Sequence, residues 1–553
     1  MVDVTRAKPA QTGQGGIVQV VTASASGTAF EWYDFFIFGA LTPIITKQFF
    51  SGVNETTGFI LALLVFGVGF GVRPLGALVF GHIGDRLGRK GAFIFTISIM
   101  GLATVAIGLL PTYAQIGVWA PFLLIALRIL QGFAVGGEYG GAAIYVAEHA
   151  THGRRGLMTA WIQTSASVGL TTALLVILAT RRTMGEEAFG EWGWRIPFLS
   201  SAALLIISLW IRLKLEESPA FRKIKEEGAI SHAPLAESFV KWDNLKIVLL
   251  TLGAITAAQG VIWYTAHFYA QFFLERVLKV DGQTVNTLFI LAVALTAPFY
   301  VLFGWLSDKI GRKPIIIGGI LAAIVTFYPG YRLMTQAANP ALAAAARTAP
   351  VTVVADPATC AVQFDPVGKA QFLSACDIAK SVLASSGVTY ANEAVAPGTP
   401  TIVKIGDTVL AMSDAAAPTK PEREALRAAG QETLKTALAA AGYPASADPA
   451  KVNMPVILAV LCWFIICATA LYGPQAAALV ELFPTRIRYT ALSLPYNIGT
   501  GWFGGFLPAT AFAIVAATGN IYAGIIFPCA VGALSVLIGL IFLPETRSRD
   551  ISR

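Results

Sequence analysis

Charged and strongly polar side chains occur in pairs inside some of the longest apolar stretches of this 553-residue sequence. Glu31 and Asp34 are three residues apart in one stretch, and Arg128 and Gln131 have the same spacing in another. In a helix, residues three apart lie on the same face. If these stretches cross a membrane, each ionised group costs on the order of 3 kcal/mol to insert, so each is a candidate functional residue.

The two pairs suit different chemistry. Glu31 and Asp34 are carboxylates, and two carboxylates close together in a medium of low dielectric constant cannot both ionise easily, which suits groups that bind and release a proton in each cycle. An interfacial position near the start of the stretch is the alternative for this pair. Arg128 is permanently charged and its planar fork fits a carboxylate, which indicates either an anionic substrate or an internal carboxylate partner.

Further polar groups in apolar stretches extend the candidate site. Glu138 lies ten residues after Arg128, about 15 Å along a helix, and either pairs with a neighbouring helix or takes the proton. Arg73 precedes Pro74, and substrate contact and structural pairing fit it equally well. A hydrogen-bonded helix contact is the alternative for His267. The expected proton-coupling residues are Glu31, Asp34 and Glu138, and the expected substrate contacts are Arg128, Gln131, Arg73, Gln163, Tyr264, His267 and Asn497.

The composition identifies the setting of these groups. Hydrophobic residues make up 55% of the chain and charged residues 13%, and the mean hydropathy is +0.66. A soluble domain usually carries about 25% charged residues, so this is a polytopic membrane protein. The net charge of +8 is explained by basic loops on one membrane face and not by nucleic-acid binding. Twelve apolar runs lie near residues 20–48, 57–82, 92–112, 118–148, 157–180, 195–214, 245–275, 284–306, 314–334, 454–480, 488–517 and 520–543.

The distribution of Lys and Arg orients these runs. Short connecting segments rich in Lys and Arg alternate with poorer ones, and an even number of spans puts both termini on the basic, cytoplasmic face. The expected domains are a cytoplasmic N-terminus (1–19), an N-terminal six-helix bundle (20–214), a cytoplasmic central loop (215–244), helices 7–9 (245–334), a periplasmic insert (335–453), helices 10–12 (454–543) and a cytoplasmic tail (544–553).

The two halves repeat each other. GHIGDRLGRK at 81–90 recurs as GWLSDKIGRK at 304–313, at an offset of 223 residues. YGGAAIYVAE at 139–148 resembles YGPQAAALVE at 472–481, at an offset of 333. About 110 residues were therefore inserted between the two matches in the second half. Two repeated bundles are typical of transporters whose binding site lies between the halves.

The repeated decapeptide falls in short hairpins, between helices 2 and 3 and between helices 8 and 9. Its glycines permit a tight turn, and its aspartates can pair with arginine or cap the next helix. We expect a charge latch that holds the bundles together in one state; simple anchoring by positive charge is the alternative. The expected gating residues are Asp85, Arg86, Arg89, Asp308 and Arg312.

Longer strings carry a resemblance to a known family. The hairpin motif resembles the major facilitator superfamily, and further strings resemble its metabolite:H+ symporter family, whose members carry 2-oxoglutarate, citrate, shikimate and proline/betaine. The resemblance covers nearly everything except the insert. It implies a twelve-helix fold and proton-coupled symport. The strings are TAFEWYDFFIFG (28–39), RILQGFAVGGEYGGAAIYVAEHA (128–150), EWGWRIPFLSS (191–201), EESPAFRK (216–223) and PTRIRYTALSLPYNIG (484–499).

The insert is predicted to be a small folded α/β unit outside the membrane. Residues 399–412 read as strand–turn–strand and residues 420–442 as a helix. Cys360 and Cys376 both fall in the insert, and an oxidising compartment makes a disulfide between them plausible. Gating, substrate capture and stabilisation are all open as its role.

We therefore predict an all-α membrane protein of twelve helices in two bundles with an α/β insert, acting as a proton-coupled carrier of a small organic acid. Arg128 requires an anion, although the carboxylate of betaine would also satisfy it. A sugar-type carrier and a non-transporting ligand sensor are the alternatives. No P-loop, catalytic constellation or metal-ligand spacing is present, so we expect neither an enzyme nor a cofactor nor a metal. We expect a monomer in the inner (plasma) membrane that binds substrate, H+ and lipid but no nucleic acid.

Overall fold

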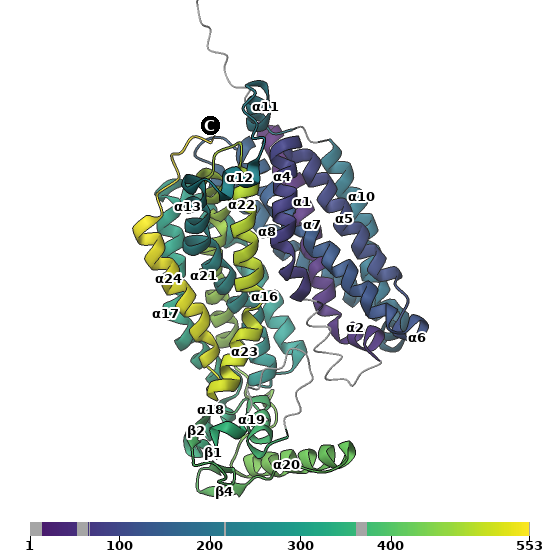
Figure 1. The fold of residues 1–553 in the computed structure, drawn as a ribbon, viewed down its shortest axis with the longest axis vertical. Helices are drawn as coiled ribbons and strands as arrows, with labels where there is room; N and C mark the ends of the chain where they lie inside the picture. Colours follow the sequence, from purple (N-terminus) through teal and green to yellow (C-terminus); the bar gives the residue numbers. More distant parts are fainter. Residues whose placement is uncertain (1–13, 52–64, 66, 215–216, 361–372, 552–553) are drawn as a thin grey trace, which may run out of the picture.

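The computed structural model describes residues 14–51, 65, 67–214, 217–360 and 373–551. Two helical bundles lie side by side, and a small insert sits at one end of them (Figure 1). Ten helices in the described part of the chain are long and apolar enough to span a membrane. Helix α1, which carries Glu31 and Asp34, and helix α4, which follows the undescribed residues 52–64 and 66, complete the expected twelve. The predicted fold class is confirmed.

The N-terminal half contains α1 (Gln14–Ala40), α2 (Thr42–Phe49), α4 (Arg73–Leu87), α5 (Arg89–Leu109), α6 (Tyr113–Ile116), α7 (Trp119–His149), α8 (Arg155–Met184), α9 (Glu186–Ala188), a π-helical turn (Phe189–Gly193) and α10 (Arg195–Leu213). Two short helices, α11 (Pro219–Glu226) and α12 (Pro234–Phe239), lead to the second half.

The C-terminal half begins with α13 (Trp242–Thr251), α14 (Ala257–Tyr264) and α15 (Ala270–Phe272), which π-helical segments join and extend to Val277. It continues with α16 (Gly282–Ile310), α17 (Arg312–Ala338), α21 (Met454–Leu482), α22 (Arg488–Asn497), a π-helical segment (Ile498–Gly504), α23 (Leu507–Thr518), a 3-10 turn (Ala523–Ile525) and α24 (Ile526–Phe542).

The repeated motif forms the same turn twice. Gly88 joins α4 to α5 with φ 117°, and Gly311 joins α16 to α17 with φ 112°. Only glycine adopts such backbone angles without strain, which explains why both copies of the motif keep it. We call the end of the molecule that carries these two turns the hairpin end, and the opposite end the insert end.

Small residues let the halves approach each other closely. Gly156 of α8 faces Gly304 of α16, and a Cβ added to either glycine would collide with the backbone of the other helix. The glycines of α7, among them Gly136 and Gly140, likewise leave no room for a Cβ beside α4 and α22. The prediction that these glycines serve close helix packing is confirmed.

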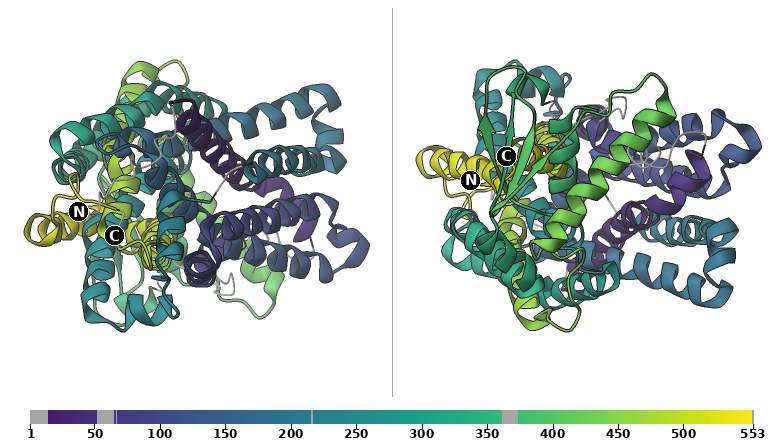
Figure 2. Two further views of the ribbon diagram at one scale, coloured as in Figure 1. Left: turned by 90° about the horizontal axis from the view of Figure 1, so that it is seen from above. Right: turned by 90° about the horizontal axis from the view of Figure 1, so that it is seen from below.

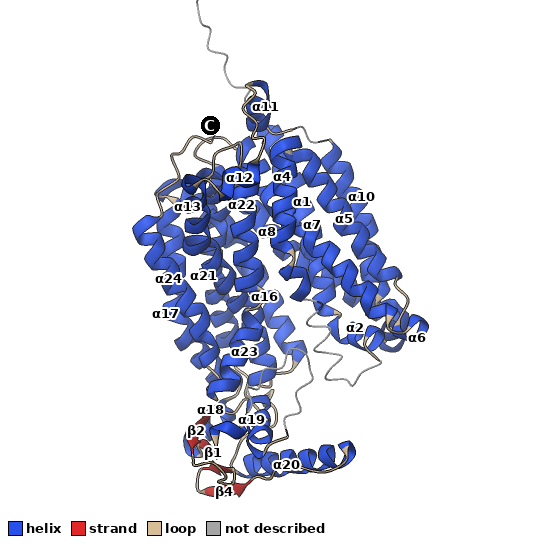
Figure 3. Ribbon diagram, viewed as in Figure 1, coloured by secondary structure: helices blue, strands red, loops and turns tan. Residues whose placement is uncertain are grey.

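The strands gather in the insert at one end of the molecule (Figure 3). The sheet order is β2 (Tyr390–Ala394), β1 (Val351–Ala355), β3 (Ile402–Ile405) and β4 (Thr408–Ala411), with β1 parallel to β2 and the other pairs antiparallel. Helices α18 (Pro340–Thr348), α19 (Ala375–Ser385) and α20 (Lys420–Ala440) complete it, together with a 3-10 turn (Pro357–Thr359). The strand–turn–strand and the long helix are confirmed, and Cys360 is bonded to Cys376 in a disulfide.

The insert docks on the C-terminal half. The backbone N–H of Tyr390 donates to the carbonyl of Gly519 at the end of α23 (2.9 Å), and the N–H of Ala447 donates to the carbonyl of Lys279 (3.0 Å). The buried apolar core of this half continues without a break into the insert. Helix α20 extends from the insert toward the side where the N-terminal half lies (Figures 1 and 2).

Gly387 should control this docking. It has φ +68°, and a Cβ there would collide with the carbonyl of Val277. We expect Gly387→Val to loosen the insert, so that the amides of Tyr390 and Ala447 exchange with deuterium at least tenfold faster in mass-spectrometric measurements. Gly398→Val is the matched control, because Gly398 has φ +84° but open space around it. Equal exchange in both variants would contradict the docking role.

Candidate functional site

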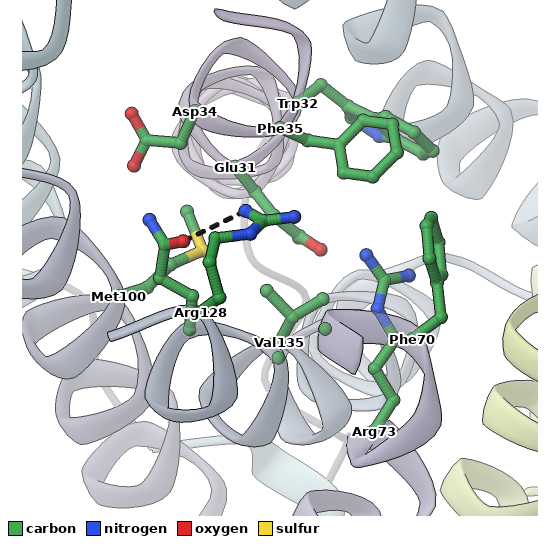
Figure 4. A pocket seen from close by; sticks show the side chains of 12 residues that line it. Glu31, Trp32, Asp34, Phe35, Phe70, Arg73, Met100, Arg128 and Val135 are labelled. Carbon is green, nitrogen blue, oxygen red and sulfur yellow. Dashed lines mark hydrogen bonds between the residues drawn. The ribbon is translucent and has the colours of Figure 1, made fainter. Parts of the chain in front are cut away.

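A small cavity inside the N-terminal half brings together five of the predicted site residues. About 30 Å³ of it can be occupied by water, which is room for one or two molecules. Helices α1, α4, α5 and α7 and the segment before α4 supply the lining (Figure 4). The lining residues are Glu31, Trp32, Asp34, Phe35, Gly69, Phe70, Arg73, Met100, Arg128, Gln131, Gly132 and Val135.

Asp34 is held in place by hydrogen bonds from two hydroxyl groups. Ser201 of α10 donates to Oδ1 at 2.6 Å, and Thr104 of α5 donates to Oδ2 at 2.9 Å. The chain of bonds continues, because Gln131 donates to the Thr104 hydroxyl (2.7 Å) and Arg128 donates to Gln131 (2.9 Å). The predicted carboxylate and the predicted guanidinium are thus linked through one buried network.

Glu31 occupies the other side of the same helix face. Its side chain is buried, and its Oε2 atom has no hydrogen-bond partner among the described residues. Figure 4 shows Glu31, Arg73 and Arg128 converging on one space. The strongest electrostatic partners of the Glu31 carboxylate include Arg73 and Asp34. Glu31 therefore retains a carboxylate oxygen that is free to take a proton or to meet a ligand.

Both cavity arginines lie against aromatic rings. The guanidinium carbon of Arg128 is 4.1 Å from the centre of the Phe38 ring, and that of Arg73 is 4.5 Å from the centre of the Phe70 ring. Contacts of this kind stabilise a cation by about 0.5–2 kcal/mol and leave the N–H edges directed elsewhere. The two cations are therefore supported from behind while their donors remain directed at a ligand.

Glu138 lies outside the cavity lining. It forms an ion pair with Arg212 of α10 (2.7 Å), and both side chains are fully buried. A Cβ at Gly27 would collide with the Arg212 guanidinium, so this glycine makes room for the pair. Sequence reasoning missed Arg212, because it lies close to the charged segment after α10 and looks like an interfacial residue.

Four side chains from both halves form a closed layer next to the cavity, which we call the tyrosine layer. Gln163 donates to the Tyr139 hydroxyl (2.7 Å), and the hydroxyls of Tyr472 and Tyr496 share a hydrogen bond (2.7 Å). The rings of Tyr139 and Tyr496 stack across the two halves at 3.6 Å with an angle of 6°. Tyr139 lies one helical turn beyond the lining residue Val135, on the side of the hairpin end. The tyrosine layer thus separates the cavity from the hairpin end.

The remaining predicted contacts in the C-terminal half have structural partners. Asn497 donates to the carbonyl of Gly136 in the other half (2.8 Å). His267 donates from Nδ1 to the carbonyl of Trp263 (2.8 Å) and stacks on the Trp263 ring. Tyr264 meets the cavity-lining ring of Phe70 edge to face, at 5.9 Å between ring centres. Tyr264 is therefore the one of these three that touches a lining residue.

The two aspartates of the repeated motif bind helix N-termini of the opposite half. Asp85 accepts hydrogen bonds from the backbone N–H groups of Tyr489 (3.1 Å) and Thr490 (2.8 Å) at the start of α22. Asp308 accepts from those of Gly156 (2.9 Å) and Leu157 (2.8 Å) at the start of α8. A carboxylate at a helix N-terminus satisfies free N–H groups and favours the helix dipole. Each half thus closes onto the other through the same contact.

The motif arginines complete the hairpin end. Arg312 pairs with Asp308 (2.7 Å) and with Glu481 (3.1 Å), and Arg89 lies 3.4 Å from Glu148. Arg86 is exposed to solvent.

Two further carboxylates hold the motif arginines from behind. Glu217 accepts from the backbone N–H of Arg89 (3.2 Å), and Glu545 accepts from that of Arg312 (2.9 Å). Sequence reasoning missed Glu217 and Glu545, although the pairs Glu217–Ser218 and Glu545–Thr546 recur at a constant offset of 328 residues.

Comparison with known proteins adds relatives along the chain. The family model described as "Sugar (and other) transporter" matches residues 19–232 and 428–553. The proline/betaine transporter of Salmonella typhimurium is 36% identical over 330 residues, which are 58% of this chain and 66% of that protein. The chain therefore spans slightly less than two thirds of the length of this relative.

Two other relatives and one solved structure extend the comparison. A putative metabolite transport protein of Haemophilus influenzae is 30% identical over 98% of this chain and 96% of its own length. The alpha-ketoglutarate permease of Escherichia coli is 35% identical over 56% of this chain and 70% of its own. The structure of XylE, a proton:xylose symporter, has a TM-score of 0.62 at 16% identity and covers 97% of this chain and 98% of that one, so it supports the fold alone.

The aspartate contacts should set how readily the hairpin end opens. A charge-assisted hydrogen bond contributes about 1.5–3 kcal/mol. We expect Asp85→Asn combined with Asp308→Asn to speed maleimide labelling of a cysteine at Ser493, which is fully buried between the halves, by at least tenfold. The measurement uses detergent-solubilised protein with the free cysteines replaced by serine.

Asp243→Asn is the control for this measurement, since Asp243 is exposed and pairs only with Lys246 among the described residues. Unchanged labelling in the double variant would show that the aspartates do not hold the halves together.

Proposed function

Because the chain belongs to the sugar (and other) transporter family of the major facilitator superfamily, we propose that it carries a small organic acid across a membrane together with protons, by alternating access. Its named relatives are transporters, not enzymes. The observation that carries the proposal is the cavity in which Arg73 and Arg128 face the carboxylates Glu31 and Asp34.

The two arginines are the proposed binding groups for the cargo. A guanidinium presents donors in a fork that matches a carboxylate, and such pairs are strongest where water is excluded. Arg128 is 5% exposed. Its one hydrogen bond to Gln131 aligns the side chain and leaves further donors for an anion. The name of the alpha-ketoglutarate permease is consistent with a carboxylate cargo.

The two carboxylates are the proposed proton carriers. A carboxylate in a cavity of this size is poorly hydrated, so a proton there replaces missing water and is released once the cavity opens to solvent. Glu138 is a less direct participant, because its charge is already balanced by Arg212.

Transport would require the hairpin end and the insert end to open in turn. The aspartate contacts and the tyrosine layer both close the hairpin end, and both join opposite halves, so a rocking of one bundle against the other would break them together. We assign the hairpin end to the cytoplasm and the insert to the periplasm, from the excess of Lys and Arg in the hairpins. The inner membrane is the corresponding location.

Arg128→Ala should abolish uptake of carboxylates. Removing one member of a buried charge pair costs about 3–5 kcal/mol, so we expect the initial rate in proteoliposomes with an imposed pH gradient to fall at least 100-fold. The panel contains 2-oxoglutarate, citrate, shikimate, betaine and xylose. Arg182→Ala, at an exposed arginine, serves as the control, and unchanged uptake by the Arg128 variant would remove that residue from the site.

Asp34→Asn should uncouple accumulation from the pH gradient. The amide cannot carry a proton, so pH-driven accumulation should fall at least tenfold while exchange of labelled for unlabelled cargo falls less. The matched control is Asp448→Asn in the insert, at an exposed carboxylate. Accumulation that responds to pH as in the parent protein would exclude Asp34 as a proton carrier.

A further inference from the structure

We propose that the cavity accepts its cargo only in a set of zero net charge, so that each negative charge of the cargo travels with one proton and the cargo carries at most two such charges. This inference rests on the proposed function and extends it to the valence of the substrate. The juxtaposition that carries it is two guanidinium groups and two carboxylates lining one small buried cavity.

The charges around the cavity balance without any ligand. The lining contains the cations Arg73 and Arg128 and the anions Glu31 and Asp34, all supplied by α1, α4 and α7. The nearest further charges in the described structure are Glu138 and Arg212, which neutralise each other. With both lining carboxylates ionised, the formal charge of the site is therefore zero.

The elements that cover the cavity add polar groups and rings but no further ionised side chain among the residues in contact with the lining. Helix α5 contributes Thr104 and α10 contributes Ser201, both as hydroxyl donors. From the other half, the rings of Trp263, Tyr264 and Phe268 meet the lining rings of Trp32, Phe70 and Phe35, respectively. The imidazole of His267 is turned to the carbonyl of Trp263.

A site closed on all sides cannot hold an unbalanced charge cheaply. The attraction between charges grows as water leaves, and so does the penalty for a charge without a partner. A monoanion adds one negative charge, which one proton on a lining carboxylate cancels. A dianion needs both carboxylates protonated. A trianion would leave one negative charge uncompensated, since no third carboxylate lines the cavity.

The hydrogen bonds indicate the order in which the carboxylates fill. Asp34 accepts two hydroxyl donors, which stabilise its ionised form. Glu31 has an oxygen without a hydrogen-bond partner in the described structure. Glu31 therefore takes the first proton and serves monoanions, and Asp34 takes the second and serves dianions.

The test measures protons and voltage together for cargoes of different valence. Proteoliposomes loaded with a pH dye and clamped with potassium and valinomycin are given shikimate (a monoanion), 2-oxoglutarate (a dianion), citrate at a pH where it is a trianion, and betaine (a zwitterion). We expect one proton per shikimate and two per 2-oxoglutarate, initial rates that change less than twofold with the imposed potential, and no uptake of trivalent citrate. Uptake that rises tenfold with an inside-negative potential, or proton-driven uptake of betaine, would overturn the proposal.

Glu31→Gln shifts the balance by one charge. With a neutral amide at this position, we expect shikimate to move without a proton and 2-oxoglutarate to move with one. Glu275→Gln is the matched control, because Glu275 is half-buried in the other half and bonds to Gln271, away from the cavity lining. Unchanged proton counts in a folded Glu31 variant, as judged by gel filtration, would contradict the inference.

The voltage measurement on the parent protein decides the matter even if that variant does not fold. Absence of uptake of every carboxylate by the parent protein would instead remove the proposed function itself, and the inference with it.

Discussion

A charge buried among membrane-spanning helices must be compensated where it lies, because neither water nor lipid will do it. The described interior satisfies this requirement in three different ways. Glu138 and Arg212 neutralise each other directly. Asp34 is held by neutral hydroxyl donors. Arg73 and Arg128 lie against aromatic faces, which supply only part of the compensation. The incompletely satisfied groups are those that line the cavity, so the chemistry is located where compensation has been left to a ligand or a proton.

The repeat in the sequence was conserved for closure and not for chemistry. The helix-capping aspartates, the carboxylates behind the hairpins and the two hydrogen-bonded pairs of the tyrosine layer all have counterparts in both halves. At the offset of 333 residues, however, Leu461 and Phe464 stand opposite Arg128 and Gln131. The second half therefore presents rings and packing surfaces to a site whose charges come from the first half.

Much of this organisation could be predicted from the sequence, because it depends on local patterns. Apolar runs define spans, positive-φ glycines recur in both hairpins, and a change of offset shows the insert. The five lining residues could be proposed because each is polar in an apolar run. What could not be predicted is the partner of each group. Arg212 lies 74 residues from Glu138, and Thr104 and Ser201 look like many other hydroxyl residues of spanning helices until packing brings them to Asp34.

The attachment of the insert has a mechanical consequence. Its core is continuous with that of the C-terminal half, so the two rotate as one piece. Helix α20 has 21 residues, hence a length of about 31 Å. A rotation of about 15°, an ordinary amplitude for a rigid-body switch, would sweep its far end through about 8 Å. The helix is thus a lever arm that amplifies a small tilt inside the bilayer into a large displacement outside it, where an antibody fragment could brake the tilt or a fluorescent dye could report it.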